Sequence, residues 1–450
     1  MGTDYKHSVS LDIEKCKGCT TCLKRCPTEA IRIRDGHAVI SSGKCIDCGE
    51  CIRVCPYKAK KATHDDLSIL GNFKYTVALP APSLYGQFDH LDNIGYIIRG
   101  LRDLGFDDVF EVACAAELVS AYTRSYIKRP DVKKPVISSA CPAITRIISM
   151  NYPYLCENLM PILPPVDIAA ALAREKAMRE HPELKPEEIG IIFISPCPAK
   201  VSYIRNSFAK ERNYISGTVS VRDVYFALLD VMKKREDEPL DMTDSGMIGI
   251  GWASTGGEST AILNDRYLAA DGIENCIRVL DQIDNSDIVT LDFVELNACS
   301  GGCVGGAMAV ENPYIAQARL QSLKRYLPVS PNRPASDWIP NEYFRDEVFE
   351  YDPTSLLSDD RKTAMRMMSD IESIRCGLPG LDCGSCGAPT CMAFAEDIVK
   401  NETTADECTV IMRQLFHEYL GEKRLESLKE RLKPLEAKKD ETEESSDDGK

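Results

Sequence analysis

The feature that most constrains this chain is its cysteine content. Twenty of its 450 residues are cysteines. Eight of them lie in two matching runs, Cys16-x2-Cys19-x2-Cys22-x3-Cys26-Pro27 and Cys45-x2-Cys48-x2-Cys51-x3-Cys55-Pro56. In a chain with no sign of secretion, clustered cysteines usually bind metal rather than form disulfides. Residues 1–64 contain little apolar core material, so bound metal is expected to supply much of the folding energy there.

The two runs have the spacing of a two-cluster bacterial ferredoxin, in which the fourth cysteine of each run ligates the other cluster. The spacing predicts one [4Fe–4S] cluster on Cys16, Cys19, Cys22 and Cys55, and another on Cys45, Cys48, Cys51 and Cys26. Zinc is the alternative metal. Zinc sites prefer isolated CxxC pairs, and two complete four-cysteine runs leave this alternative little weight.

Composition and charge narrow the class of protein further. Apolar residues make up 44% of the chain and charged residues 27%, and the formal net charge is −15. This charge argues against nucleic acid and against an anionic membrane as partners. The first residues contain no apolar signal-peptide region, and the longest apolar runs are too short to cross a bilayer. The sequence therefore predicts a soluble, cytoplasmic protein.

From about Phe73 onward, strand-like apolar runs alternate with helical stretches. The expected strands lie at 75–79, 134–140, 188–195 and 287–296, and the clearest helices lie at 168–180 and 221–234. This alternation predicts α/β layers with parallel sheet, a fold class in which ligands bind beyond the carboxyl ends of the strands. Three of the expected strands run directly into a cysteine-bearing loop.

These patterns divide the chain into four parts. We predict a two-cluster ferredoxin-like domain at 1–68, a central α/β domain at 69–350, a small C-terminal [4Fe–4S] domain at 365–415 and a tail at 416–450. In the tail, Leu425, Leu428 and Leu432 predict a short amphipathic helix that ends near Pro434. A coiled-coil dimer is the less favoured alternative, and the polar end of the tail is expected to be disordered.

Seven further cysteines are scattered through the central region. Cys114, Cys156 and Cys276 are expected to be small buried core residues. The other four lie in loops marked by Gly or Pro, namely Cys141 in SSACPAI, Cys197 in SPCPAK, and Cys299 with Cys303 in ELNACSGGCVGG. Four thiolates that converge at strand ends predict another cluster site.

These three loops resemble the H-cluster motifs of [FeFe]-hydrogenases, TSCCPxW, MPCxxKxxE and ExMACxxGCxxGG, in their order and in their strand context. The resemblance covers about residues 1–350 and implies a central domain of two parallel-sheet halves with flanking helices. It implies that Cys141, Cys197, Cys299 and Cys303 hold a [4Fe–4S] cube, with Cys303 bridging to a diiron subsite. In the family, that subsite carries CO, cyanide and an azadithiolate.

The same resemblance implies roles for residues around the diiron subsite. Lys200 matches the lysine that donates to a cyanide ligand. Pro82 and Ser83, in APSLY, match the family's loop beside the diiron site. Gly256 and Gly257, in ASTGGES, match a glycine turn of the family.

The chain departs from the family in the residues that handle protons. Ala140 stands where catalytic members have the cysteine that passes protons to the dithiolate amine. The other replacements are Thr123 and Tyr126 for two carboxylates of the proton path, Tyr203 for a glutamate, and Ser195 and Asn297 for two methionines. Positioned proton transfer typically contributes about 10²–10⁴ in rate, so we expect slow turnover. The pattern resembles the sensory subgroup of the family that lacks a PAS domain and carries an extra C-terminal cluster.

The tail cluster is predicted from a third cysteine group. Cys383-x2-Cys386-x4-Cys391, with Cys408 further on, resembles the small [4Fe–4S] domain of Rnf-complex and corrinoid-protein subunits. Cys376 lies outside this pattern. It is expected to be a spare buried thiol, with a role as replacement ligand as the less favoured alternative.

Four functional hypotheses follow, of which a structural cluster protein without a redox role is the least favoured. The first is a hydrogenase of low turnover that senses H2 or redox state and relays electrons through its accessory clusters. The second is a working hydrogenase with another proton route, for example through Tyr126, Tyr203 and water. The third is a non-catalytic electron carrier or assembly factor without the diiron subsite. The expected partners are H2 and protons, a ferredoxin-like or signalling redox protein, and maturation enzymes for the diiron subsite; a homodimer stays open.

Overall fold

The computed structural model describes residues 5–206, 214–232, 242–285, 290–353 and 356–419. The chain divides into two compact units. The main unit comprises residues 1–17, 25–30 and 40–355, and the small unit comprises 18–24, 31–39 and 356–450. The predicted helix around Leu425 and the polar end of the tail lie outside the described residues.

A parallel sheet forms one half of the main unit. Among the described residues its strand order is β6-β5-β8-β9, with β5 (Tyr75–Pro80), β6 (Asp108–Val109), β8 (Ile189–Ser195) and β9 (Gly217–Ser220). β5 and β8 coincide with two of the expected strands, and Tyr75 is paired with Ile189. All of β8 is buried, as expected of a parallel strand that is covered on both faces.

Helices cover both faces of this sheet. The α-helices of the main unit are α2 (Glu50–Arg53), α3 (Gly95–Asp103), α4 (Val112–Ile127), α5 (Pro142–Asn151), α6 (Pro165–Glu180), α7 (Pro198–Arg205), α8 (Val221–Met232), α9 (Met247–Gly251), α10 (Gly257–Ala261), α11 (Ile273–Asp284) and α12 (Pro313–Lys324). Its 3-10 helices are η1 (Leu67–Asn72), η2 (Pro82–Gln87), η3 (Pro153–Asn158), η4 (Pro186–Glu188), η5 (Cys303–Gly305) and η6 (Asn341–Tyr343). The expected helices at 168–180 and 221–234 correspond to α6 and α8.

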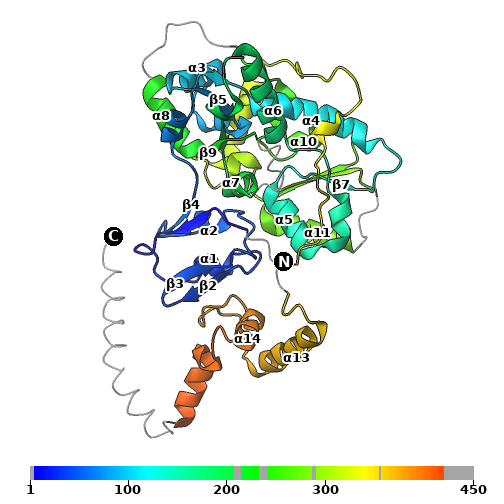
Figure 1. The fold of residues 1–450 in the computed structure, drawn as a ribbon. Helices are drawn as coiled ribbons and strands as arrows, with labels where there is room; N and C mark the ends of the chain where they lie inside the picture. Colours follow the sequence, from blue (N-terminus) through cyan, green and yellow to red (C-terminus); the bar gives the residue numbers. More distant parts are fainter. Residues whose placement is uncertain (1–4, 207–213, 233–241, 286–289, 354–355, 420–450) are drawn as a thin grey trace, which may run out of the picture. The chain divides into compact units, whose positions relative to one another are not determined.

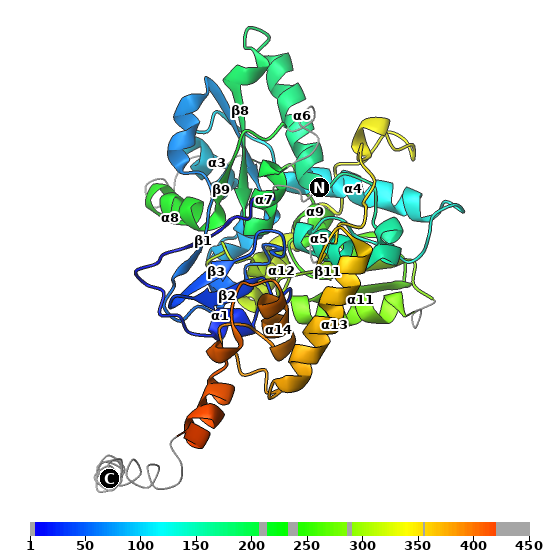
Figure 2. The same cartoon turned by 60° about the horizontal axis from the view of Figure 1, so that its bottom comes forward.

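Side chains alternate between the two faces of the sheet, as the pleat of a strand requires. Val77 and Ile191 pack into a core with residues of α4 and α6. Ala78 and Ile192 pack into a second core with residues of α3, α8 and α12. Figures 1 and 2 show α3 and α8 on one side of the strands and α4 and α6 on the other. The predicted α/β layers with parallel sheet are therefore confirmed.

A second parallel sheet forms the other half of the main unit. Its order in the described chain is β10-β11-β7, with β10 (Tyr267–Asp271), β11 (Phe293–Asn297) and β7 (Val136–Ile137). A third core lies between this sheet, α5 and α11, and it includes the buried Cys156 and Cys276. Cys114 is buried as well, so the prediction of three core thiols is confirmed.

β7 is shorter than the strand expected at 134–140. Ser138 still donates from its backbone to the carbonyl of Val294, at 2.9 Å. After that bond the chain leaves the sheet and runs to Cys141, the N-cap of α5. The chain therefore stops pairing with β11 after Ser138, where it turns into the loop that carries Cys141.

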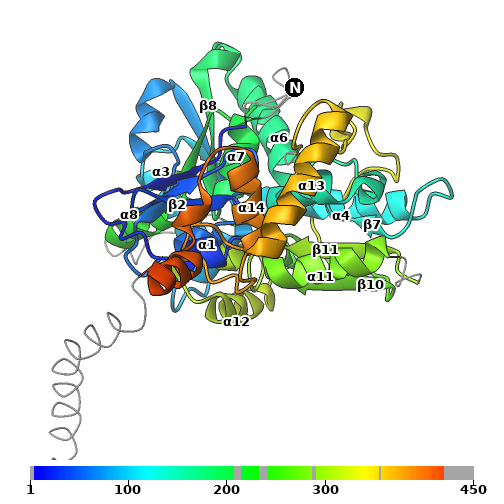
Figure 3. The same cartoon turned by 90° about the horizontal axis from the view of Figure 1, so that it is seen from below.

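The remaining small elements belong to the cysteine-rich parts of the chain. β1 (Val9–Leu11) pairs with β4 (Lys60–Ala62) in the main unit. The small unit contains the strand pair β2 (Ile31–Arg34) and β3 (His37–Ile40), with α1 (Thr21–Lys24), α13 (Arg361–Gly377), α14 (Cys391–Val399) and η7 (Ala405–Glu407). α13 lies alongside α14 (Figure 3). None of the described helices has the length and apolar character needed to cross a membrane.

Candidate metal centre

Four cysteines of the main unit lie at the carboxyl ends of its strands. Cys197 follows β8 and caps α7, and Cys141 follows β7 and caps α5. Cys299 and Cys303 follow β11, which pairs in parallel with β7. Parallel strands present their carboxyl ends at the same edge of a sheet, so β7 and β11 bring the loops of Cys141, Cys299 and Cys303 together, while Cys197 follows a strand of the other sheet.

Two glycines let the cysteine loops approach closely. A Cβ atom at Gly306 would collide with the carbonyl oxygen of Pro196, so the loop after Cys303 packs directly on the loop of Cys197. Gly302 has a φ of +88°, and a Cβ there would lie 2.6 Å from the backbone nitrogen of Thr255. The glycine turn at 255–257 therefore rests against the same loop.

The four thiols lie close enough to shift one another's pKa. Burial, together with the neighbouring Cys299 and Cys141, raises the pKa of Cys197 to about 12. Burial and the same group of thiols raise the pKa of Cys303 well above its usual range. Four thiolates gathered in this way repel one another unless a cationic group binds them.

The donor set fits a cluster. Cys303 is solvent-accessible although protein atoms crowd around its thiol, so a bound group can reach its sulfur. In the described part of the chain, no three His, Cys, Asp or Glu side chains form a group that would hold a single metal ion. A [4Fe–4S] cube is larger than one ion, and four thiolates at strand ends are a suitable donor set for it.

Lys200 lies one turn into α7, next to this cysteine group. Burial lowers the pKa of Lys200 overall, and the charges of Asp167 and of the thiols of Cys197 and Cys303 oppose this effect by favouring the charged form. Its Nζ atom lies 5.2 Å from the ring centroid of Tyr203. The lysine is thus positioned to place a positive charge beside the site.

Asp167 supplies a carboxylate that the sequence interpretation missed. Tyr203 donates a hydrogen bond to Asp167 at 2.5 Å, and Arg345 donates to the Tyr203 hydroxyl at 3.4 Å. Burial raises the pKa of Asp167, whereas Tyr203, Lys200 and Arg345 lower it. The sequence shows no glutamate at position 203, but α6 provides a carboxylate near Lys200 instead. Helix packing creates this pairing, so local spacing does not reveal it.

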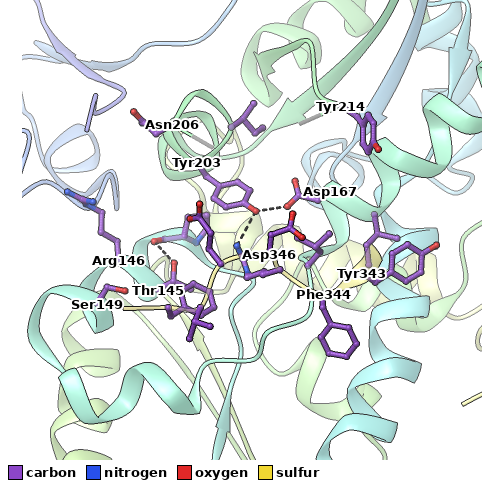
Figure 4. Close-up of a pocket in the computed structure, with 18 of the residues that line it drawn as sticks. Thr145, Arg146, Ser149, Asp167, Tyr203, Asn206, Tyr214, Tyr343, Phe344 and Asp346 are labelled. Atoms are coloured by element: carbon purple, nitrogen blue, oxygen red, sulfur yellow. Dashed lines mark hydrogen bonds between the residues drawn. The ribbon is translucent and has the colours of Figure 1, made fainter. Parts of the chain in front are cut away.

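Tyr203 and Asp167 also line a pocket in the main unit (Figure 4). The pocket has a volume of about 1120 Å³ and is lined by residues of α5, α6 and α7 and by the segment 342–352. Figure 4 shows the Tyr203 side chain directed toward Asp167. Water in this pocket would therefore reach the Tyr203–Asp167 pair.

The loop that carries Pro82 and Ser83 is buried in η2. The Ser83 hydroxyl is buried and has no hydrogen-bond partner among the described residues. Gln87 fixes the loop by donating from its side chain to the carbonyl of Ser83 at 3.0 Å. A buried hydroxyl without a partner is costly, so it indicates a polar group that binds there.

A buried carboxyl group lies next to the Cys141 loop. The Ser138 hydroxyl donates to Glu258 at 2.6 Å and accepts from the backbone nitrogen of Ala140 at 3.2 Å. The second carboxyl oxygen of Glu258 is buried without a partner in the described part of the chain. Burial and the charge of Glu295 raise the pKa of Glu258 well above its usual range. The surroundings of Glu258 therefore favour its protonated form, and two hydrogen bonds through Ser138 connect its carboxyl group to the backbone nitrogen of Ala140.

Glu295 is the second buried carboxyl group of this pair. Burial raises its pKa, and hydrogen bonds to its oxygens oppose that effect. Its donors are the backbone nitrogens of Gly256, at 3.0 Å, and Ser259, at 2.8 Å, and the side-chain amide of Asn297, at 2.8 Å. The sequence analysis missed both glutamates. The available signal was a charged residue inside the apolar strand FVELN and another inside the glycine turn.

The remaining replaced positions make local contacts. Thr123 is buried, and its hydroxyl donates to the carbonyl of Val119 at 2.8 Å. Tyr126 is half-buried and lies against the guanidinium of Arg129. The Ser195 hydroxyl donates to the carbonyl of Cys197 at 3.0 Å and so orders that loop. Neither Thr123 nor Tyr126 carries a carboxylate, and their match to the family's proton path stays a prediction.

Part of the ferredoxin-like segment belongs to the main unit. Burial and the thiols of Cys51 and Cys26 raise the pKa of Cys48, which places three of the cysteines predicted for one cluster close together. Cys45 responds in the same way to burial and, more weakly, to Cys48 and Cys51. The other predicted set is divided, with Cys16 and Cys55 in the main unit and Cys19 and Cys22 in the small unit. Its grouping stays a prediction.

The tail cysteines lie in the small unit. Burial, Cys408 and Cys383 raise the pKa of Cys386, and Cys391 begins α14. Cys408 is buried in a small apolar core. Cys376, expected to be a buried thiol, is exposed on α13, so that prediction is wrong. α13 buries Ile371 but turns most of its surface outward, and Cys376 falls on the outward side.

Comparison with known families agrees with this site. The family described as iron only hydrogenase large subunit, C-terminal domain, matches residues 74–307, which is more than half of the chain. The chain therefore belongs to the iron-only, or [FeFe], hydrogenase family. A 4Fe-4S dicluster domain matches residues 8–56, and an Fe-S cluster domain matches residues 378–410.

Individual relatives are distant. The periplasmic [Fe] hydrogenase large subunit of Nitratidesulfovibrio vulgaris is 26% identical over 382 residues, covering 70% of this chain and 89% of its own length. Iron hydrogenase 1 of Clostridium pasteurianum is 24% identical over 293 residues, 53% of this chain, and this chain spans 51% of that relative. A solved [FeFe]-hydrogenase structure from Chlamydomonas reinhardtii has a TM-score of 0.45 and 17% identity, covering 59% of this chain and 90% of that one.

Proposed function

We propose that this chain holds an H-cluster and interconverts H2 with two protons and two electrons at low turnover, serving as a sensor of H2 or of redox state. The observation that carries the proposal is the convergence of four thiols with Lys200, combined with Ala140 in place of a proton-passing cysteine. Cys141, Cys197, Cys299 and Cys303 would hold the cubane, and Cys303 would bridge to the diiron subsite. When bound, that subsite supplies the metal chemistry that splits H2.

The chain's own residues would orient the cofactor. Lys200 presents a cation beside Cys303, suited to a donor bond to an anionic cyanide ligand. The free Ser83 hydroxyl and the Pro82 loop line the same region in the family pattern. Asp167 and Tyr203 hold Lys200 in place by charge and by ring contact. The residues present therefore fit the group.

Protons would take a route through Glu258. Burial and Glu295 favour the protonated form of its carboxyl group, which accepts a hydrogen bond from the Ser138 hydroxyl, and that hydroxyl accepts one from the Ala140 backbone nitrogen. Because Glu258 lies beside the loop and not at position 140 itself, the transfer is expected to be less direct than through a cysteine. This arrangement favours slow turnover rather than a complete loss of turnover.

Electrons would be relayed in either direction through the accessory clusters, between the central site and a ferredoxin-like or signalling redox partner. The thiols that would hold these clusters need a reducing compartment, and we therefore propose a cytoplasmic location. Maturation enzymes would install the diiron subsite. The alternative is an electron carrier or assembly factor that keeps the cubanes and has no diiron subsite.

Infrared spectroscopy of the anaerobically matured protein tests the proposal. We expect CO and cyanide stretching bands that shift when H2 is admitted. Absence of these bands in protein with intact cubanes and full maturation would reject the H-cluster and favour the electron-carrier alternative.

An Ala140→Cys variant tests whether the missing cysteine limits turnover. We expect a modest rise in H2 production because Thr123 and Tyr126 still interrupt the rest of the family's proton path. Ala140→Ser is the matched control, since a hydroxyl is a much weaker acid than a thiol and should raise the rate less than the cysteine does. A parent protein that already turns over as fast as a metabolic hydrogenase would contradict the sensory role.

A further inference from the structure

Arg53 contacts two different cysteine groups of the main unit. It is the last residue of α2, two positions after Cys51. One of its terminal nitrogens, Nη1, lies 3.6 Å from the Sγ atom of Cys299. The other, Nη2, donates to the backbone carbonyl of Cys48 at 3.0 Å. A single guanidinium thus spans the ferredoxin-like loop and the central cysteine site.

Further contacts hold this guanidinium in place. Its Nε atom donates to Glu50 at 3.1 Å, and Nη1 also approaches the carbonyl of Gly305 at 3.4 Å. Glu50 in turn lies 3.6 Å from Arg25. Arg53 is therefore fixed by several partners, and its direction toward Cys299 is set by the surrounding structure.

The two loops that Arg53 joins are in direct contact. Gly49 has a φ of +75°, and a Cβ there would lie 2.6 Å from the side chain of Ala307 and 3.6 Å from Pro198. Asp47 accepts a hydrogen bond from Ser202 of α7 at 2.8 Å. The loop of Cys45, Cys48 and Cys51 therefore rests on the loops that carry Cys197 and Cys303.

A second arginine fixes the same interface without touching sulfur. Arg146 of α5 donates to the carbonyl of Cys45 at 2.8 Å and to the carbonyl of Gly43 at 2.8 Å. Arg146 therefore holds α5 against the loop of Cys45 independently of Arg53. Both arginines stabilise the interface, but Arg53 contacts a cysteine sulfur and Arg146 contacts backbone carbonyls. Comparing variants of the two therefore distinguishes an electrostatic effect on the cubane from a purely structural one.

We propose that Arg53 sets the direction of electron transfer by raising the reduction potential of the cubane held by Cys299 above that of the neighbouring cluster held by Cys26, Cys45, Cys48 and Cys51. This inference rests on the cubane assignment of the proposed function. A reduced cubane carries one more negative charge than the oxidised one. A cation and an N–H donor at its thiolate stabilise the reduced state more than the oxidised state.

The step is a single electron exchange. One electron leaves the neighbouring cluster, which is oxidised, and enters the Cys299 cubane, which is reduced. No bond forms or breaks and no proton moves. Arg53 contacts a carbonyl of one cluster loop but the sulfur of the other, so its effect is larger on the Cys299 side. It acts as a positioning residue that biases where the electron resides.

The test is a redox titration monitored by electron paramagnetic resonance. The full chain is produced without maturation enzymes, so it carries cubanes alone, and dithionite supplies the electrons. The signal of the Cys299 cubane is assigned as the one lost in Cys197→Ala. In Arg53→Gln we expect the partition of the electron toward this cubane to fall about tenfold, which is about 59 mV for one electron. Arg53→Lys keeps the positive charge, so the partition of the electron toward the Cys299 cubane should fall less in this variant.

Arg146→Gln is the matched control, and we expect it to leave the potential of the Cys299 cubane unchanged. An unchanged potential in Arg53→Gln, or an equal shift in both variants, would show that Arg53 is merely a structural clamp and would overturn the inference. If the paramagnetic resonance spectra of the parent and of Cys197→Ala are the same, no signal can be assigned to the Cys299 cubane. That result would overturn both this inference and the cubane assignment. Absent infrared bands together with a potential shift in Arg53→Gln would reject the diiron subsite and leave the role of Arg53 supported.

Discussion

At the scale of single residues, the proton route depends on whether Glu258 can release and regain its proton. Glutamine has the shape of a protonated glutamate but does not ionise, so Glu258→Gln keeps the packing and removes the transfer. We expect turnover in matured protein to fall by about 10²-fold or more. The measurement is H2 production with a reduced dye, with iron content as the check on loading. Asp292→Asn, a change at a buried carboxylate paired with Lys134, is the control and should keep its turnover per loaded site.

Glu258 also makes the stability of the protein depend on pH. Burial and Glu295 raise its pKa in the folded state, so the folded protein keeps a proton that the unfolded chain loses above its ordinary pKa of about 4.3. The folded state then binds more protons, and the free energy of unfolding falls as the pH rises through this window. We expect urea unfolding between pH 5 and 8 to show a smaller fall in Glu258→Gln.

Asp292 should behave in the opposite way. Burial acts to raise its pKa, but hydrogen bonds from Lys134, Asn264 and Arg266 lower it overall. Its contribution to stability is present above the unfolded pKa and is lost as the pH falls. Asp292→Asn should therefore lower stability at neutral pH and reduce the loss at acid pH. A pH profile of Glu258→Gln identical to that of the parent would contradict the assignment of a proton to Glu258.

At the scale of elements, the cysteine loops need close backbone contact. Gly306→Ala would push the loop after Cys303 away from Pro196, because the new Cβ has backbone on the other side and nothing flexible to displace. We expect this variant to lose the central cubane and keep the other clusters, seen as lower iron content and as loss of the signal that depends on Cys197. Gly71→Ala is the matched control, since a Cβ there meets nothing within 4 Å. Full cluster content in Gly306→Ala would show that the loops tolerate separation.

The same elements show what sequence patterns could predict. The runs that became β5 and β8 were clear because continuous apolar residues bounded by loops are typical of buried parallel strands. β7 was predicted too long because hydrophobicity does not reveal where a chain leaves a sheet toward a site. Asp167 and Glu258 were missed because their partners Lys200 and Ser138 lie far along the chain. Tertiary packing creates these pairs, whereas the cysteine spacing that predicts clusters is local.

At the scale of the whole molecule, the proposed electron relay would require the cysteine-bearing segments to be held close to one another. In the small unit, Asp397 of α14 is buried and accepts from Arg32 at 2.7 and 3.0 Å and from Arg34 at 2.6 Å, both on β2. Lys24 of α1 donates to the carbonyls of Asp382 and Pro389, on either side of the cysteine loop. These bonds attach the tail cysteine loop to the helix that contains Cys22.

Asp397→Asn should therefore loosen the tail domain. Removing one partner of a buried ion pair typically costs about 3–5 kcal/mol, and the partial exposure of Arg34 places this case at the low end, about 3 kcal/mol. We expect faster proteolysis of residues 356–419 and a lower urea midpoint for that region, while the central cubane keeps its signal. Glu372→Gln breaks a fully exposed pair with Arg375 and should leave both readouts unchanged. Equal proteolysis of the parent and Asp397→Asn would mean that apolar contacts alone, such as those around Phe394, hold this domain in place.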